Sequence, residues 1–228
     1  MNRVNTQGIV LSRTNYGEAD RILTFLTPEY GKVSAIAKGV RKQKSKLAGG
    51  IELFSISDIS YIIGRKEIST LISTRLVKHY GTIVKDLDRT AAAYEFLKLI
   101  NKNTEDQPEP AYFDLLAQSL AALDEPSLDL ELISIWFPAQ LLKLAGHTPN
   151  LRTDNTDKKL QADKKYDFDF EKMCFMAGRN FNADSIKFLR LLFSSSGPQN
   201  LQKVQGFSKL SAQIKPLVNS VASGLIRS

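Results

Sequence analysis

The sequence predicts an α+β protein, in which an N-terminal five-stranded barrel of the OB-fold (the oligonucleotide/oligosaccharide-binding fold) precedes an α-helical domain. The first 80 residues alternate between apolar and polar side chains in short runs, which is the pattern of half-buried strands. After Gly81 the apolar residues recur at helical spacing. A chain of 228 residues has room for two such modules. We therefore expect an OB domain at residues 1–80 and a helical domain at residues 81–228.

Five runs in the first domain are rich in Ile, Val, Thr, Phe and Tyr, which strands favour. Turn residues separate them, for example Pro28 and Gly31, Gly49, and the signal at residues 64–66. Five strands in so short a segment suit a small barrel, and the OB-fold has this strand number. An SH3-like barrel stays open, because strand counting does not separate the two. The predicted strands span residues 8–13, 21–27, 32–40, 53–63 and 68–77.

Helical spacing defines the second domain. Ser127 is a good capping residue, so we expect it to begin the third helix, and Pro138 should kink that helix or start another. Residues 147–182 are mostly polar and break the helical pattern, which predicts an irregular insertion. Within it, Asp167 and Asp169 alternate with phenylalanines, which indicates a half-exposed strand rather than a metal-binding acid pair. The other predicted helices span residues 83–98, 111–123, 183–193 and 208–226.

The positive charge of the chain is concentrated in the predicted OB domain. Residues 1–80 hold 13 Lys and Arg against 6 Asp and Glu, whereas residues 81–228 hold 18 of each. This asymmetry is typical of a polyanion-binding module beside a neutral one. A basic surface that serves only solubility is the alternative.

No pattern of catalytic residues is present, so we expect that the protein is not an enzyme. The Walker and nucleophile-elbow motifs are missing, and His79 and His147 lack a nearby cysteine or paired carboxylate. Cys174 is the single cysteine, which excludes an intramolecular disulfide and a cysteine-based zinc cluster. No apolar run reaches the roughly 18 residues of a membrane span, and no secretory signal begins the chain. These features predict a cytoplasmic protein.

The segment KGVRKQKSK, residues 38–46, carries five basic side chains in nine residues and no acid. It leaves the third predicted strand and enters a loop. Lys and Arg side chains there would neutralise nucleic-acid phosphates, which gives affinity without base reading. A solvated loop or a localisation signal is the alternative. Tyr16, in the polar context NYGEAD, is the better candidate for an exposed ring on which bases stack.

The stretch GIVLSRTNYGEADRILTFLTPEYGKVSAIAKGVRKQKSKLAG, residues 8–49, resembles the start of the family of the bacterial DNA repair protein RecO. The family's pattern is an apolar strand, a Tyr-Gly-Glu-x-Asp-Arg turn, Thr-x-x-x-Gly-Lys, and Ala-Lys-Gly followed by basic residues and Ser. The later segment FPAQLLKLAGHTPNL is similar to the family's Phe-x-x-x-Leu-Leu…Gly-x-x-Pro-x-Leu stretch. The residues that carry the N-terminal likeness are Tyr16, Gly17, Glu18, Asp20, Arg21, Thr27, Gly31, Lys32, Ala37, Lys38, Gly39, Arg41 and Ser45.

The resemblance implies a recombination mediator that binds single- and double-stranded DNA and anneals complementary strands, in the bacterial cytoplasm at the nucleoid. It also implies three partners: the ring-forming protein RecR, the C-terminal tail of the single-strand-binding protein, and indirectly the recombinase RecA. We expect the tail in a groove of the helical domain near Arg179, Lys187 and Arg190. The expected DNA-binding residues are Lys38, Arg41, Lys42, Lys44 and Lys46, flanked by Arg13, Arg21, Lys32 and Tyr16.

Arg21 has an alternative role, because it could fix its turn by pairing with Glu18 or Asp20. Two other functions also stay open. One is a protein–protein adaptor that reaches DNA only through its partners, and the other is an OB protein that binds structured RNA.

Many members of that family bind zinc through two Cys-x-x-Cys pairs, the first of which follows the Pro-x-Leu. Here Leu151 is followed by RTDNTDKK, without a cysteine, and Cys174 alone cannot form a four-cysteine site. We therefore expect no zinc and no other cofactor. Polar contacts or packing must then hold residues 147–182 together.

Overall fold

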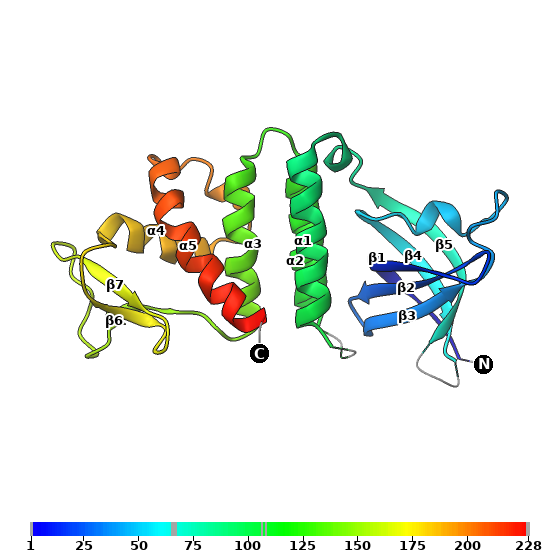
Figure 1. The fold of residues 1–228 in the computed structure, drawn as a ribbon, viewed down its shortest axis with the longest axis horizontal. Helices are drawn as coiled ribbons and strands as arrows, with labels where there is room; N and C mark the ends of the chain where they lie inside the picture. The colour runs from blue at the N-terminus through cyan, green and yellow to red at the C-terminus, as the bar shows by residue number, and fades with distance from the viewer. Residues whose placement is uncertain (1, 65–67, 106, 108, 227–228) are drawn as a thin grey trace. The chain divides into compact units, whose positions relative to one another are not determined.

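The computed structural model describes residues 2–64, 68–105, 107 and 109–226 (Figure 1). Its contacts divide the chain into two compact units, Met1–Glu125 and Pro126–Ser228. The first unit contains the barrel and two α-helices, and the second contains three α-helices and a small sheet. The sequence predicts a domain boundary at residue 80, between the barrel and the helices. That boundary stays a prediction.

The N-terminal barrel has the predicted OB-fold. Its strands close in the order β1-β2-β3-β5-β4, and all neighbours are antiparallel except β3 and β5. This Greek-key order, in which β5 crosses to lie between β3 and β4, is that of the OB-fold rather than the SH3-like alternative. Part of the turn expected at residues 64–66 lies outside the described residues. The strands are β1 (Arg3–Tyr16), β2 (Asp20–Thr27), β3 (Gly31–Ala37), β4 (Ser55–Ile62) and β5 (Ser69–His79).

The barrel is filled because the strands alternate between inward and outward side chains. In the pair β2–β3, Leu23 lies opposite Ala35, and both are fully buried. Thr24 and Ser34, the next pair along the register, are only half-buried. A filled interior leaves the outer faces and loops of a small barrel for ligands. The buried core consists of Val4, Val10, Leu23, Phe25, Ala35, Ala37, Val40, Ile51, Ile59, Tyr61 and Leu71.

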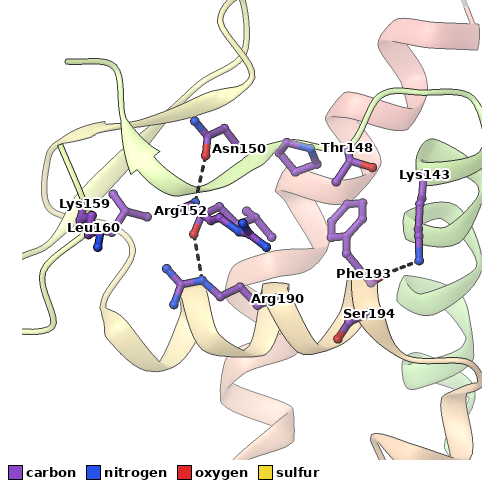
Figure 2. A pocket seen from close by; sticks show the side chains of 11 residues that line it. Lys143, Thr148, Asn150, Arg152, Lys159, Leu160, Arg190, Phe193 and Ser194 are labelled. Atoms are coloured by element: carbon purple, nitrogen blue, oxygen red, sulfur yellow. Dashed lines mark hydrogen bonds between the residues drawn. The ribbon is translucent and has the colours of Figure 1, made fainter. Parts of the chain in front are cut away.

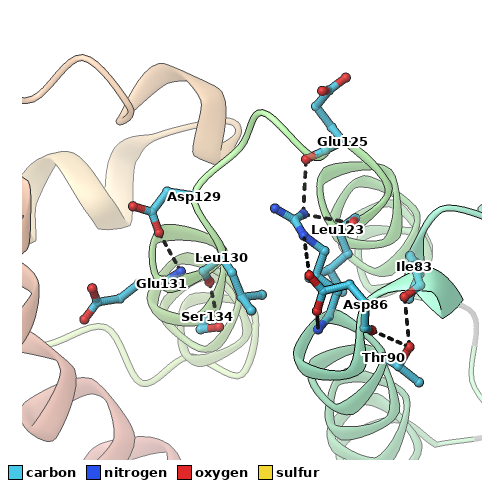
Figure 3. Close-up of polar contacts among 10 residues, drawn as sticks. Ile83, Asp86, Thr90, Leu123, Glu125, Asp129, Leu130, Glu131 and Ser134 are labelled. Atoms are coloured by element: carbon cyan, nitrogen blue, oxygen red, sulfur yellow. Dashed lines mark hydrogen bonds and ion pairs between the residues drawn. The ribbon is translucent and has the colours of Figure 1, made fainter.

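Two helices complete the first unit and lie side by side (Figure 1). Arg89 on α1 is only 7 % exposed, and its guanidinium donates hydrogen bonds to the carbonyls of Leu123 (3.0 Å) and Glu125 (3.1 Å) (Figure 3). A buried cation at the end of α2 satisfies carbonyls that have no partner within the helix and complements the helix dipole. This arginine therefore joins α1 to α2. The helical segments are η2 (Ile83–Lys85), α1 (Leu87–Asn103) and α2 (Pro110–Asp124), and η1 (Ala48–Gly50) lies between β3 and β4.

The helices of the second unit differ from the prediction at the start of α3. Asp129, not Ser127, is the N-cap, and its carboxylate accepts a hydrogen bond from Glu131 N at 2.7 Å (Figure 3). An ionised cap satisfies free N–H groups and complements the helix dipole better than a hydroxyl does. Pro138 lies inside α3 and does not begin a new helix. The helices are α3 (Leu130–Leu144), α4 (Ala183–Ser194), η3 (Pro198–Asn200) and α5 (Phe207–Ile226).

The segment that the sequence indicates as irregular contains a three-stranded sheet. Its strand order is β6-β8-β7, and the strands are β6 (Asn150–Asp154), β7 (Tyr166–Asp169) and β8 (Cys174–Ala177). Phe175 is fully buried at its centre, with edge-to-face ring contacts to Tyr166, Phe168 and Phe181 at centroid distances of 5.4 to 6.2 Å. The half-exposed strand inferred from Asp167 and Asp169 is β7, since Phe168 is buried between them. Aromatic packing therefore holds this part of the chain.

None of the helices in the described part of the chain combines the length and the hydropathy that a membrane span requires.

Candidate nucleic-acid and partner interfaces

The five cations of residues 38–46, the basic loop from here on, all face solvent. Lys38, Arg41, Lys42, Lys44 and Lys46 are exposed, and the loop leads from the end of β3 towards η1. No acidic residue interrupts it. Exposed cations this close together can contact several phosphates of one polyanion at once.

The basic loop is fixed to the β1–β2 turn at the same end of the barrel. The Asp20 carboxylate accepts a hydrogen bond from Gly39 N at 2.7 Å. Arg41 donates twice to that turn, from its backbone N–H to Ala19 O at 2.9 Å and from its guanidinium to Gly17 O at 3.4 Å. Gly39 has φ +64°, a conformation that favours glycine. These bonds set the direction in which the loop leaves the strand.

Tyr16 lies beside this anchor. It ends β1, pairs in register with Asp20 across the turn, and is 55 % exposed. Its ring is therefore available to a base that lies near the basic loop.

The three flanking cations are already engaged with the protein. Arg13 forms an ion pair with Glu52 at 3.3 Å. Arg21 donates to the side chain of Asn15 at 3.1 Å, rather than to Glu18 or Asp20, the two acids that the sequence suggests as partners. Lys32 donates from Nζ to Asn101 O at 3.0 Å, near the end of α1. These side chains carry charge at the barrel surface, but they are less free to move to a ligand than the five cations of the basic loop.

A second cationic region, which we name the basic groove, lies in the second unit. It has a volume of about 790 Å³. Apolar side chains line it, including Leu151, Leu160 and Phe193, and the described lining contains no Asp or Glu. The basic side chains around it are Lys143, Arg152, Lys159 and Arg190 (Figure 2).

Two hydrogen bonds shape the basic groove (Figure 2). Arg190 on α4 donates from Nε to Leu151 O at 2.8 Å, which leaves its terminal nitrogens for other partners. Lys143 on α3 donates to Phe193 O at 3.1 Å, so its positive charge lies at the C-terminal end of α4, where it complements the helix dipole. The groove thus combines apolar walls with fixed positive charge, a chemistry that suits an acidic peptide with apolar side chains.

Of the three residues named from the sequence for a partner peptide, only Arg190 lines the basic groove. Lys187 lines a different hollow, of about 410 Å³, between α4 and the start of α5. Arg179 is exposed in the loop before α4, where its backbone N–H donates to the Asp167 carboxylate. Sequence reasoning missed the other three cations of the groove, because no local pattern joins residues that only the fold brings together.

The four-cysteine zinc site that the family resemblance implies cannot form from the single cysteine of this chain. Cys174 is buried in β8, and burial first, then the nearby carboxylate of Asp169, raises the pKa of its thiol. A thiol must ionise to bind zinc, so this environment disfavours it as a ligand. Across the described ranges, no three His, Cys, Asp or Glu side chains are grouped so as to hold a metal ion.

Comparison with known proteins matches two family models to most of the chain. The model described as "Recombination protein O N terminal" matches residues 1–80, and "Recombination protein O C terminal" matches residues 84–213. A protein named DNA repair protein RecO from Dehalococcoides mccartyi is 37 % identical over 163 residues, which cover 71 % of this chain and 64 % of that protein. One of the same name from Bacillus pumilus is 31 % identical over 185 residues, 81 % of this chain and 71 % of that protein.

The chain thus spans slightly less than two thirds of the length of the Dehalococcoides mccartyi relatives. The two family models together nevertheless cover both the barrel and the helical part. The protein belongs to the recombination protein O family.

Proposed function

We propose that this protein is a recombination mediator in DNA repair, which binds single- and double-stranded DNA and anneals complementary strands on its OB barrel. It would act in the bacterial cytoplasm at the nucleoid, without catalysing a covalent reaction. The observation that carries the proposal is the basic loop: five exposed cations on one segment, held against the β1–β2 turn by three hydrogen bonds. Family membership supports the same role.

Annealing requires that two polyanions approach each other. Cations on one surface reduce the repulsion between the strands, and the release of counterions supplies binding free energy that does not depend on sequence. Contacts of this kind are weak singly and exchange quickly, so strands can slide until their bases match. The exposed ring of Tyr16 can hold an unpaired base meanwhile.

We propose the basic groove as the site for the C-terminal tail of the single-strand-binding protein. The tail is acidic and apolar, and the groove offers four cations around apolar walls. Binding there would bring the protein to DNA that is already coated with the single-strand-binding protein. Help from RecR in loading RecA onto that DNA is the remaining part of the proposal, and it rests on family membership alone.

Binding of the isolated protein to a labelled oligonucleotide tests this function. We expect a shifted band with single-stranded and duplex DNA, affinity that falls with salt, and faster annealing of complementary oligonucleotides than without protein. If DNA is shifted only after RecR is added, the adaptor function is correct instead. If structured RNA competes far better than single-stranded DNA, the RNA-binding function is favoured.

A further inference from the structure

A groove lined by residues of β3 and β4 is not accounted for by the basic loop. It has a volume of about 510 Å³ and runs beside the first half of β3. Among the described residues, β3 and β5 pair at Ala35–Ser69 and Ile36–Thr70, and no described strand pairs with the preceding part of β3 on that side. Its lining includes Tyr30, Lys32, Ser34, Tyr61, Ile63 and Ile68, and we name it the β3 groove.

We propose that the β3 groove holds an unstacked base of single-stranded DNA, with Tyr30 as its stacking partner. The inference rests on the proposed function and deepens it, since it gives single strands a contact that a duplex cannot make. The β2–β3 face is where OB barrels hold oligonucleotides. The side chains that stack on bases differ from one OB-fold protein to the next. Here the β3 groove assigns that role to Tyr30.

The turn that carries Tyr30 is rigid. Thr27, which is fully buried, accepts a hydrogen bond from Tyr30 N at 3.1 Å and donates one to Gly31 O at 3.0 Å. Gly31 has φ +63°, and a Cβ there would lie 2.3 Å from Gln107 O, so only glycine fits. The backbone of the turn is therefore fixed before any ligand binds, which reduces the entropy lost on binding.

The ring of Tyr30 packs against a buried ring and is also partly exposed to solvent. It is 44 % exposed, and it meets the buried ring of Tyr61 edge to face at a centroid distance of 6.5 Å. Ile63 and Ile68, which are also exposed, supply apolar surface in the same groove. An exposed aromatic ring flanked by aliphatic side chains is a surface on which any of the four bases can stack.

The polar groups of the β3 groove suit a sugar–phosphate backbone. Lys32 Nζ uses one of its three donors on Asn101 O and keeps the others for a phosphate. The hydroxyl of Ser34 lines the same groove. Burial, with smaller effects of Tyr30 and Glu29, raises the pKa of Tyr61 to about 12, so its hydroxyl carries no negative charge at neutral pH.

The β3 groove and the basic loop lie along one strand. β3 runs from Gly31 to Ala37, and the basic loop follows at once. Seven residues at about 3.3 Å each span roughly 20 Å. A few nucleotides therefore join the two regions, within the roughly 4–16 that an OB-fold contacts. In a duplex every base is stacked on both faces, so the groove adds affinity only for single strands.

Binding of a Tyr30→Ala variant to two DNAs, oligo-dT and a duplex of equal length, tests the assignment. We expect the affinity for oligo-dT to fall about tenfold, the magnitude of one lost base–aromatic stack, while duplex affinity changes less than twofold. Tyr30→Phe keeps the ring and should bind as wild type. Tyr94→Ala is the control, because Tyr94 is exposed on α1 outside the groove. Equal binding of oligo-dT by Tyr30→Ala and wild type would overturn the proposal, and so would an equal loss on both DNAs.

Base stacking on Tyr30 can also be measured directly, which keeps the proposal testable if the Tyr30→Ala variant does not fold. An oligonucleotide with one 2-aminopurine base should lose fluorescence on binding the Tyr16→Ala variant, whose β3 groove is intact, because the base stacks on Tyr30. No loss of fluorescence with DNA bound would refute the groove alone. Failure of wild-type protein to bind either DNA would instead refute the proposed function.

Discussion

The carboxylate of Asp20 accepts a hydrogen bond from the backbone N–H of Gly39, at 2.7 Å. This bond joins the β1–β2 turn to the first residues of the basic loop. An acid so close to five cations opposes DNA binding by its charge, yet it fixes the loop that carries them. The two effects have opposite signs, so substitution can separate them.

Replacing Asp20 with alanine should weaken DNA binding several-fold, although it removes a negative charge. Loss of a hydrogen bond to a charged group should destabilise the contact between the β1–β2 turn and the basic loop by about 1.5 kcal/mol. Hydrogen exchange measured by mass spectrometry should therefore be faster at the amides of Gly39 and Arg41. Asp20→Asn keeps an acceptor without the charge and should bind DNA at least as tightly as wild type. Glu18→Ala is the charge control, since Glu18 is exposed on the same turn. Tighter binding by Asp20→Ala would show that the tether has no role.

Removing Lys38, Arg41 and Lys42 together should weaken single-strand binding and flatten its salt dependence. Each lost phosphate contact lowers the slope of log K against log salt by about 0.7, so the triple alanine variant should lose about 2 from the slope. The measurement is fluorescence anisotropy of a labelled oligonucleotide over a range of salt concentrations. The control removes the same charge from exposed positions on the helical side of the unit, Lys85, Lys98 and Lys102. An unchanged slope in the first variant would contradict the basic loop as the DNA contact.

The barrel could be predicted from the sequence because its signals are local. Parts of β2 and β3, residues 22–25 and 34–37, alternate in burial with period two, and Pro28 and Gly31 mark the turn between the strands. Of the sheet β6-β8-β7 only β7 was predicted, because strands of four or five residues are too short for a clear period-two pattern. Its core depends on Phe175 meeting rings that lie six to nine positions away along the chain.

The candidate binding regions also differ in whether the sequence alone predicts them. The basic loop was predictable because its five cations lie within nine residues of the sequence. The basic groove was not, because Lys143, Arg152 and Lys159 come from three different segments and meet Arg190 only in the folded unit. The sequence does not separate Tyr30 from the aromatic residues that fill the core, whereas its exposure and its place in the β3 groove do.

Charge reversal in the basic groove should weaken binding of the tail peptide of the single-strand-binding protein. Arg152→Glu with Lys159→Glu places two acids beside an acidic ligand, so we expect at least a tenfold loss in affinity by titration calorimetry. These exposed side chains can be changed without removing the Arg190–Leu151 hydrogen bond. Arg179→Glu is the matched control outside the groove and should bind normally. If Arg179→Glu and not the double variant loses the peptide, the tail lies elsewhere in the unit.

The purified protein should contain no stoichiometric zinc. Cys174 is the single cysteine, and its buried position disfavours the ionised thiol that zinc needs. Elemental analysis by mass spectrometry measures the metal content directly, and a chelator should leave the melting temperature unchanged. One equivalent of zinc per chain would show that other residues replace the cysteines that the family resemblance implies.

Phe175→Ala should unfold the sheet β6-β8-β7. Phe175 is fully buried and makes edge-to-face contacts with three rings, so its truncation removes the centre of the aromatic cluster. Large-to-small changes of a buried phenylalanine cost about 3–5 kcal/mol. Hydrogen exchange of the amides in β7 and β8 should therefore rise by orders of magnitude, while the barrel amides, in the other unit, exchange as in wild type. Met176→Ala, one position along on the exposed face of β8, should cost less than about 1 kcal/mol. Slow exchange in both variants would mean that polar contacts rather than ring packing hold the sheet.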